Sequence, residues 1–89
     1  MDFSDALIAM KDGHHLAREG WNGKNMYVFL QKGYPEGITC NAQTAEAAGL
    51  NVGDLFRCHP YLQMKAVDGS YFMWYPNMLD LLADDWVIV

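Results

Sequence analysis

The stretch that decides the fold runs from residue 18 to residue 31 and reads Arg18-Glu19-Gly20-Trp21-Asn22-Gly23-Lys24-Asn25-Met26-Tyr27-Val28-Phe29-Leu30-Gln31. Its first half concentrates glycine and asparagine, which predicts a tight turn over residues 20–25. Its second half, residues 26–31, is rich in aromatic and branched side chains and predicts a strand. Because residues 14–18 are also expected to be extended, the stretch predicts two strands joined by a turn.

The segment before this turn predicts an N-terminal helix. Apolar residues at three- and four-residue spacing mark one face over residues 3–11. Asp2 or Ser4 can cap the first turn of this helix, and Gly13 can end it. The first third of the chain is therefore expected to be helix, strand, turn and strand.

Further strands are predicted towards the C-terminus. Residues 61–67 alternate as a strand, residues 68–69 form a hairpin turn, and residues 71–75 return as the partner strand. A short apolar strand over residues 86–89 closes the chain, and the acidic pair at residues 84–85 is expected to be a solvated turn. The expected fold class is α+β, with about five strands in a small antiparallel sheet and helices against it.

The remaining segments predict two short helices and a loop. Pro76 can open a final helix that runs through Leu82, with Leu79 and Leu82 on its inner face. Residues 32–37 contain Gly-Tyr-Pro-Glu-Gly and are expected to form a loop. Residues 41–48 favour a short helix.

The length and composition limit the class of protein. The 89 residues leave room for one domain, residues 1–89, and a chain this short buries only about 60% of its unfolded surface. Apolar residues make up 52% of the chain, which is more than a small monomer easily buries, so we expect a homo-oligomer. A formal net charge of −5 argues against a nucleic-acid polymer as partner. No apolar run approaches the roughly 20 residues of a membrane span, so we expect no membrane partner.

Metal, redox and catalytic chemistry have little support in the sequence. The residues Cys40, Cys58, His14, His15 and His59 lack the paired spacing of a zinc site, so we expect no metal. No secretory leader begins the chain, and the two cysteines are therefore expected to be free thiols in a cytosolic protein. The chain has no Walker-type loop and no nucleophile elbow. We expect neither a cofactor nor an enzymatic activity.

The turn itself is the best-marked candidate for ligand binding. The face of Trp21 can stack on a nucleobase for roughly 1–3 kcal/mol, and Arg18 and Lys24 carry charges that suit phosphate. Asn22 can hydrogen-bond a polar edge, and Gly23 allows close approach of the backbone. On the residues alone, a hairpin turn whose Trp fills the core is the commoner arrangement, so both interpretations stay open.

A second candidate lies in residues 71–80. Strand alternation places Phe72 and Trp74 on one face. It places Tyr71, Met73 and Tyr75 on the other. Asn77 is expected in the first turn of the final helix, where free backbone N–H groups favour anions. Asp80 lies one turn further along the same side. These groups could bind the polar edge of a base or ribose, and the alternative is a core strand followed by an ordinary helix start.

The ordered motifs are Phe3-x-x-Ala6-Leu7, Gly13, Arg18-x-Gly20-Trp21-Asn22-Gly23-Lys24, Trp74-x-Pro76 and Asp80-x-Leu82-Ala83-x-Asp85-Trp86. In this order they resemble a family of short phage and prophage proteins, the second type of Thoeris anti-defence protein. The resemblance runs from about residue 3 to residue 89. Residues 32–58 carry little of it.

The resemblance implies a sponge in the host cytoplasm. Such proteins are homotetramers that bind a cyclic ADP-ribose isomer, here of the glycocyclic type, made by bacterial TIR-domain immune enzymes, and they hold it without degrading it. Their pockets lie between protomers. The implied ligand-binding residues are Arg18, Trp21, Asn22, Gly23, Lys24, Trp74, Asn77 and Asp80. The sequence departs from the pattern at Asn77-Met78, where relatives are expected to carry Ser-Gln.

Two other functions remain open on the residues. The chain could be a protein–protein inhibitor that blocks a host enzyme through an acidic, aromatic surface. It could also be a small hydrolase that degrades the signal, although the shortage of catalytic groups argues against this.

Overall fold

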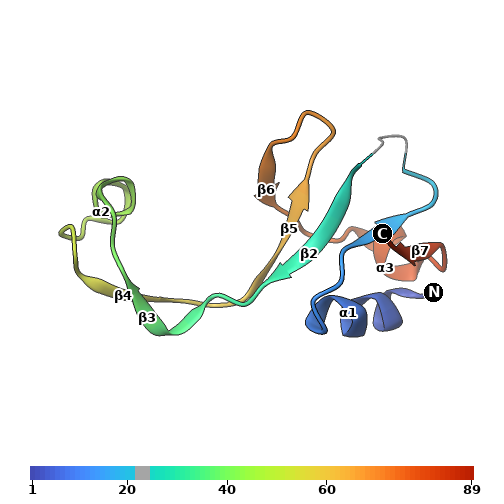
Figure 1. The fold of residues 1–89 in the computed structure, drawn as a ribbon, viewed down its shortest axis with the longest axis horizontal. Helices are drawn as coiled ribbons and strands as arrows, with labels where there is room; N and C mark the ends of the chain where they lie inside the picture. The colour runs from blue at the N-terminus through green and yellow to red at the C-terminus, as the bar shows by residue number, and fades with distance from the viewer. Residues whose placement is uncertain (22–24) are drawn as a thin grey trace.

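The chain folds into a five-stranded sheet that carries helices and a long projecting arm (Figure 1). The structure is a computed structural model that describes residues 1–21 and 25–89. The described elements are, in order, α1 (Phe3–Lys11), β1 (Leu16–Arg18), β2 (Tyr27–Gln31), β3 (Tyr34–Thr39), α2 (Ala42–Ala48), β4 (Leu55–Cys58), β5 (Tyr61–Lys65), β6 (Tyr71–Met73), α3 (Met78–Leu82) and β7 (Trp86–Ile88). The predicted α+β class and the five-stranded antiparallel sheet are confirmed.

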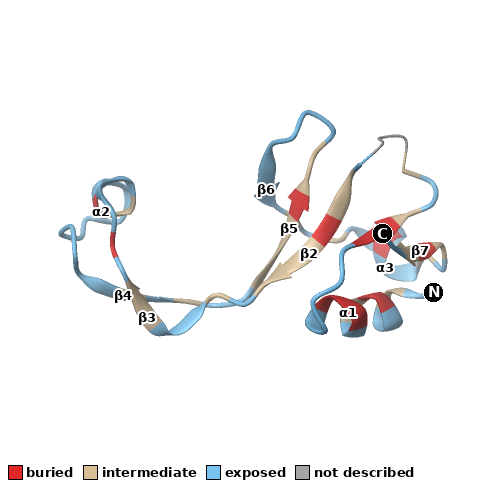
Figure 2. Ribbon diagram, in the orientation of Figure 1, coloured by how far each residue is buried: buried red, intermediate tan, exposed pale blue. Residues whose placement is uncertain are grey.

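The sheet has the strand order β6-β5-β2-β1-β7, and every described pair in it is antiparallel. Val28 pairs with Leu16 on one side and with Met64 on the other. All three side chains are buried. They share one face of the sheet, because paired residues point the same way and successive residues along a strand alternate between faces. Helix α1 packs on this face and adds Ala6 and Met10 to the core. Figure 2 shows the buried residues concentrated in α1 and in the strands beside it.

Helix α1 begins and ends as its sequence predicts. Asp2, rather than Ser4, is the N-cap, and its carboxylate accepts a hydrogen bond from the backbone N–H of Asp5 at 2.9 Å. The helix ends before Gly13, whose φ of +96° lies in a region that side chains rarely adopt. The chain can therefore turn directly from α1 into β1.

The arm is the part of the chain between β2 and β5, residues 32–60. It continues these two strands outward as the two-stranded ribbon β3-β4 and carries α2 at its tip (Figure 1). The molecule measures 44 × 27 × 22 Å, and its radius of gyration is 15.5 Å, against about 12 Å for a compact domain of this length. We call the rest of the described chain the body.

The predicted loop at residues 32–37 is wrong from Tyr34 onward, and β4 was not predicted at all. Tyr34 pairs with Cys58 and Ile38 pairs with Phe56, so β3 carries two extra residues in a bulge between these pairs. The bulge accommodates Pro35, which lacks a backbone N–H and is tolerated in strands chiefly at edges and bulges. Loop-forming residues therefore lie inside a strand.

The predicted helix in the arm is confirmed as α2. The side chain of Asn41 caps it by accepting a hydrogen bond from the backbone N–H of Thr44 at 2.8 Å. Gly49 ends it with a left-handed conformation at φ +73°. Local capping residues therefore define this helix although little is buried beneath it.

The inner face predicted for the last helix is wrong. Leu79 and Leu82 are 74% and 77% exposed. Helix α3 begins after Asn77, which is its N-cap rather than part of its first turn, and it turns Asp80 inward. Polar partners of Asp80, not apolar packing of the leucines, set this orientation.

Candidate functional site

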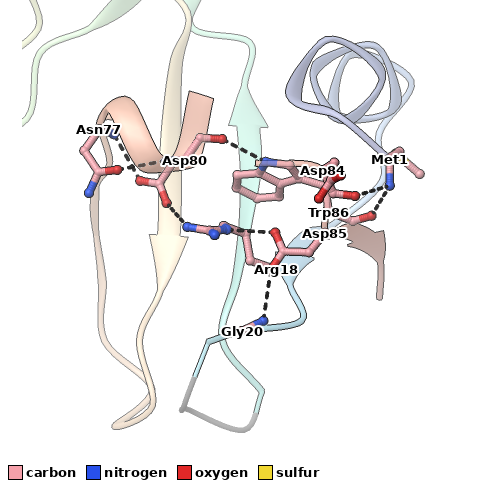
Figure 3. Close-up of polar contacts among 8 residues, drawn as sticks. All are labelled: Met1, Arg18, Gly20, Asn77, Asp80, Asp84, Asp85 and Trp86. Carbon is pink, nitrogen blue, oxygen red and sulfur yellow. Dashed lines mark hydrogen bonds and ion pairs between the residues drawn. The ribbon is translucent and has the colours of Figure 1, made fainter. Parts of the chain in front are cut away.

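Arg18 is the centre of an ion-pair cluster that joins β1 to the C-terminal elements (Figure 3). Its Nη1 donates to Oδ1 of Asp80 at 3.0 Å, and its Nε donates to Oδ1 of Asp85 at 2.9 Å. These hydrogen bonds, led by the one to Asp85, raise the pKa of Arg18 above its ordinary value. The same contact with Arg18 lowers the pKa of Asp85. Arg18 and Asp85 therefore both stay charged at neutral pH.

Asp85 also holds the start of the turn. Its Oδ2 accepts a hydrogen bond from the backbone N–H of Gly20 at 3.2 Å (Figure 3). The expectation that residues 84–85 form only a solvated turn is therefore wrong for Asp85. The sequence concealed this role because the partners are 65 and 67 residues away along the chain.

Asp80 is buried and uses both carboxylate oxygens within the chain. Oδ1 accepts from Arg18, and Oδ2 accepts from the backbone N–H of Asn77 at 3.0 Å. Asn77 returns the contact by accepting from the backbone N–H of Asp80 at 2.9 Å, which completes a capping box. The backbone carbonyl of Asp80 accepts from the indole of Trp86 at 3.0 Å. Two of the predicted ligand-binding residues thus organise α3.

Three tryptophan rings meet beside this cluster. The ring of Trp21 lies 5.4 Å from that of Trp86 and 6.2 Å from that of Trp74, in both cases edge to face. Trp86 is fully buried, whereas Trp21 and Trp74 are half-buried and pack against the core. The structure thus supports the core-turn interpretation for the packing of Trp21. Contact between Trp21 and a ligand stays a prediction.

A groove lies where the arm joins the body, and Trp74 forms part of its wall. Its volume is about 600 Å³, within the usual range for small-molecule sites. The lining is largely apolar and aromatic and consists of Cys58, His59, Pro60, Tyr61, Leu62, Met73, Trp74, Tyr75 and Pro76. Because Trp74 also touches Trp21, the groove and the turn share one wall.

The structure brings together only some of the predicted ligand-binding residues. Arg18, Asn77 and Asp80 lie in the polar cluster, Trp21 lies on the core, and Trp74 lines the groove. The remaining three, Asn22, Gly23 and Lys24, lie outside the described residues.

Sequence reasoning missed the far wall of the groove. His59 and Pro60 lie between the poorly predicted middle of the chain and the predicted strand that begins at Tyr61, and the neighbouring Tyr75 was noted only as part of an aromatic strand. This wall comes next to Trp74 through the β5–β6 pairing, beside which the backbone N–H of Trp74 donates to the carbonyl of Leu62 at 2.9 Å. The predicted hairpin was therefore the signal that could have found it.

Metal-binding clusters and membrane-spanning helices are both absent from the described ranges, residues 1–21 and 25–89. No group of three or more His, Cys, Asp or Glu side chains in them could hold a metal ion. Cys40 and Cys58 are both free thiols. No helix in the same ranges is long and apolar enough to cross a bilayer.

The fold and the site define a small α+β domain with an aromatic groove beside a turn held by ion pairs. The family model described as Tad2-like, the Thoeris anti-defense 2-like domain, matches residues 1–89. The chain is also 33% identical over 92 residues to the protein named Thoeris anti-defense 2 of Bacillus phage SP01, covering 100% of this chain and 94% of the phage protein. The chain therefore belongs to the Thoeris anti-defense 2-like family, which supports a phage anti-Thoeris role.

Proposed function

We propose that this protein is a sponge that counters Thoeris immunity by sequestering a cyclic ADP-ribose isomer, of the glycocyclic type, made by TIR-domain enzymes. The observation that carries the proposal is the match to the anti-defense family over residues 1–89. The protein holds the molecule intact in the host cytoplasm and is not an enzyme. Sequestration by mass action then keeps the signal from its receptor.

The chemistry of the groove supports a nucleotide as ligand. Its aromatic lining offers faces on which a base can stack. None of its lining residues is Asp or Glu, so an anionic pyrophosphate meets no carboxylate there although the chain carries a net charge of −5. Because two carboxylates already neutralise Arg18, we expect it to position the turn rather than to bind phosphate directly.

Affinity requires more than this open groove. A sponge that competes with a sensor needs nanomolar binding, about 12 kcal/mol, and a preformed, shielded pocket supplies this more readily than an open one. We therefore include a homo-oligomer, a homotetramer, in the proposal, with a second protomer covering each groove. The surplus of exposed apolar side chains is consistent with such an assembly.

The test is ligand capture followed by release. The protein is incubated with candidate cyclic ADP-ribose isomers, desalted and heated, and the supernatant is analysed by mass spectrometry. Intact ligand is the expected result. Cleaved product would indicate a hydrolase, and no retained ligand would contradict sequestration.

A pair of tyrosine variants tests the groove. Tyr75 lines it and is 76% exposed, whereas Tyr34 is 52% exposed and lies outside its lining. Tyr75→Ala should weaken capture by about tenfold, the loss expected for one stacking contact. Tyr34→Ala is the matched control and should leave capture unchanged. Equal effects of the two changes would remove the groove from the proposal.

Inhibition of a host enzyme is the second candidate function. The exposed apolar side chains of α3, Met78, Leu79 and Leu82, favour it because they could contact a protein partner. This alternative predicts co-purification with a host protein and no captured nucleotide.

A further inference from the structure

The central sheet has a second face, opposite α1, which no described helix covers. The strand registers place three rows of side chains across this face. The rows are Tyr27–Lys65–Tyr71, Phe29–Gln63–Met73 and Gln31–Tyr61. We call these eight residues the open face.

The aromatic side chains of the open face already contact one another. His15 lies outside the eight open-face residues but stacks on Tyr27, with ring centroids 4.2 Å apart and planes 7° from parallel. The ring of Phe29 lies 5.8 Å from that of Tyr27 and 6.1 Å from that of Tyr71. Because these rings support one another, a partner would meet an ordered surface, and less side-chain entropy would be lost on binding.

The charge of the open face is unlike that of the chain as a whole. The chain has eleven Asp and Glu residues and a net charge of −5, yet none of the eight open-face residues is acidic. Its one cation, Lys65, lies at the end of β5. Its Nζ donates to the backbone carbonyl of Asn25 at 3.3 Å and lies 5.6 Å from the centre of the Tyr27 ring. Two copies could therefore meet here without opposing carboxylates.

The chain exposes more surface than a compact monomer of its mass, in part because the arm projects from the body. Its accessible surface measures 6299 Å², whereas a compact monomer of this mass exposes about 5,300 Å². The excess of roughly 1,000 Å² compares with about 800 Å² buried per partner in a standard protein interface. A second copy is a partner of matching size and chemistry.

We propose that the open face is an interface between two copies of this chain, packed sheet against sheet across a two-fold axis. The inference rests on the self-association proposed above and specifies the surface that mediates it. A two-fold contact brings the same surface patch of both copies together. The donors, acceptors and apolar groups of the patch must therefore complement an identical patch.

The glutamine pair on the open face meets this requirement. Gln31 Nε2 donates to Gln63 Oε1 at 2.8 Å, which leaves the amide N–H groups of Gln63 and the carbonyl oxygen of Gln31 to pair with the partner's. Facing sheets lie about 10 Å apart, a separation that the aromatic side chains can fill.

The experiment places a carboxylate on the open face and a matched one elsewhere. Gln63→Glu should weaken the assembly by about tenfold or more, because the two-fold axis brings like charges together. In sedimentation velocity over a concentration series, the assembled mass should fall by half. Gln43→Glu makes the same chemical change at an exposed residue of α2 and should leave the mass unchanged.

A charge-swapped mixture keeps the test independent of folding. Gln63→Lys should also weaken assembly when alone, and mixing it with Gln63→Glu should restore the full mass. Met73→Glu, at a side chain 50% exposed on the same face, is a second disruptive variant should Gln63→Glu fail to fold.

The two proposals fail in different ways. A wild-type protein that stays monomeric at every concentration would overturn both the self-association and the open-face interface. An assembled wild type whose mass none of the open-face changes alters, or alters only as much as Gln43→Glu does, would overturn the interface alone.

Discussion

The body and the arm are held together by different forces. The body surrounds Trp86, which is fully buried together with Met10 and Leu16. Within the arm, Cys40 and Ala45 are the buried residues, each less than a tenth exposed. The regular structure of the arm comes from the β3-β4 pairing and the caps of α2. The comparison teaches that regular secondary structure and a core need not coincide, and that the two regions should differ in local stability.

The largest expected effect is removal of the core tryptophan. Trp86→Ala should lower the free energy of unfolding by about 3–5 kcal/mol, as do other large-to-small changes in cores. It also removes the indole hydrogen bond to the Asp80 carbonyl. Urea unfolding measures the loss. The arm control, Leu55→Ala at a side chain 73% exposed, should stay within about 0.5 kcal/mol, and an equal loss there would show that the arm and the body share one core.

The next effect should appear at the junction of the two regions. Gly33 has a φ of +69°, and a Cβ there would lie 2.5 Å from the backbone oxygen of Cys58. Gly33→Ala should therefore cost more than the roughly 1–2 kcal/mol of a left-handed residue, because the neighbouring backbone must also shift. Hydrogen exchange should speed up in β3 and β4 and stay unchanged in α1.

Gly53→Ala is the matched control for that change. Gly53 also has a positive φ, +92°, but a Cβ there meets nothing within 4 Å. Its effect should be limited to the backbone strain. If Gly33→Ala accelerates exchange throughout the body as well, the arm and the body unfold as one unit and the distinction between them fails.

A smaller effect should follow loss of the α3 cap. Asn77→Ala should lower the free energy of unfolding by about 1 kcal/mol, the usual value of an N-cap side chain. Asn77→Ser keeps a capping oxygen and should therefore retain most of the stability that Asn77→Ala loses. Thermal unfolding of the two variants measures the difference.

The same pair of variants separates capping from ligand contact at Asn77. If Asn77→Ser restores stability but not nucleotide capture, the amide itself contacts the ligand. If it restores both, Asn77 acts only through α3.

The smallest expected difference concerns Asp85 and depends on pH. Its pKa in the folded protein is lowered below the ordinary value of 3.8, chiefly by Arg18, so its contribution is present above pH 3.8 and is lost as the pH falls through the folded pKa. Urea unfolding should show Asp85→Asn less stable than wild type at pH 7, with the difference shrinking in acid.

The control for this change is Asp84→Asn, at an exposed neighbour. The difference in free energy of unfolding between Asp84→Asn and wild type should not shrink in acid. A difference for Asp85→Asn that is constant from neutral to acid pH would show that the Arg18 ion pair does not hold the turn.

The local elements could be predicted because their signals lie within a few residues. Asp2, Asn41 and Gly49 mark helix ends by their own hydrogen bonds and backbone angles, and alternation marks β2 and β5. The arm could not be predicted, because Pro35 and Gly37 are typical of loops and only the bulged pairing with β4 makes them part of a strand.

The candidate site was predicted in its residues but not in its arrangement. The sequence singled out Arg18, Trp74 and Asp80, yet it did not show that Arg18 and Asp80 bind each other or that Asp85 is the second partner. It also did not show the groove, although the predicted hairpin of β5 and β6 is the pairing that brings His59 and Trp74 into one lining.

The sequence by itself determined the α+β class, the ends of α1 and α2 set by capping residues, the five-stranded sheet and the motifs of the anti-defense family. These follow from short-range hydrogen bonding and side-chain periodicity, which are properties of neighbouring residues. Only the tertiary structure decided that Asp80 turns inward while Leu79 and Leu82 face outward. The carboxylate is satisfied by Arg18, which lies 62 residues away in the chain, and no periodicity within a five-residue helix contains that information.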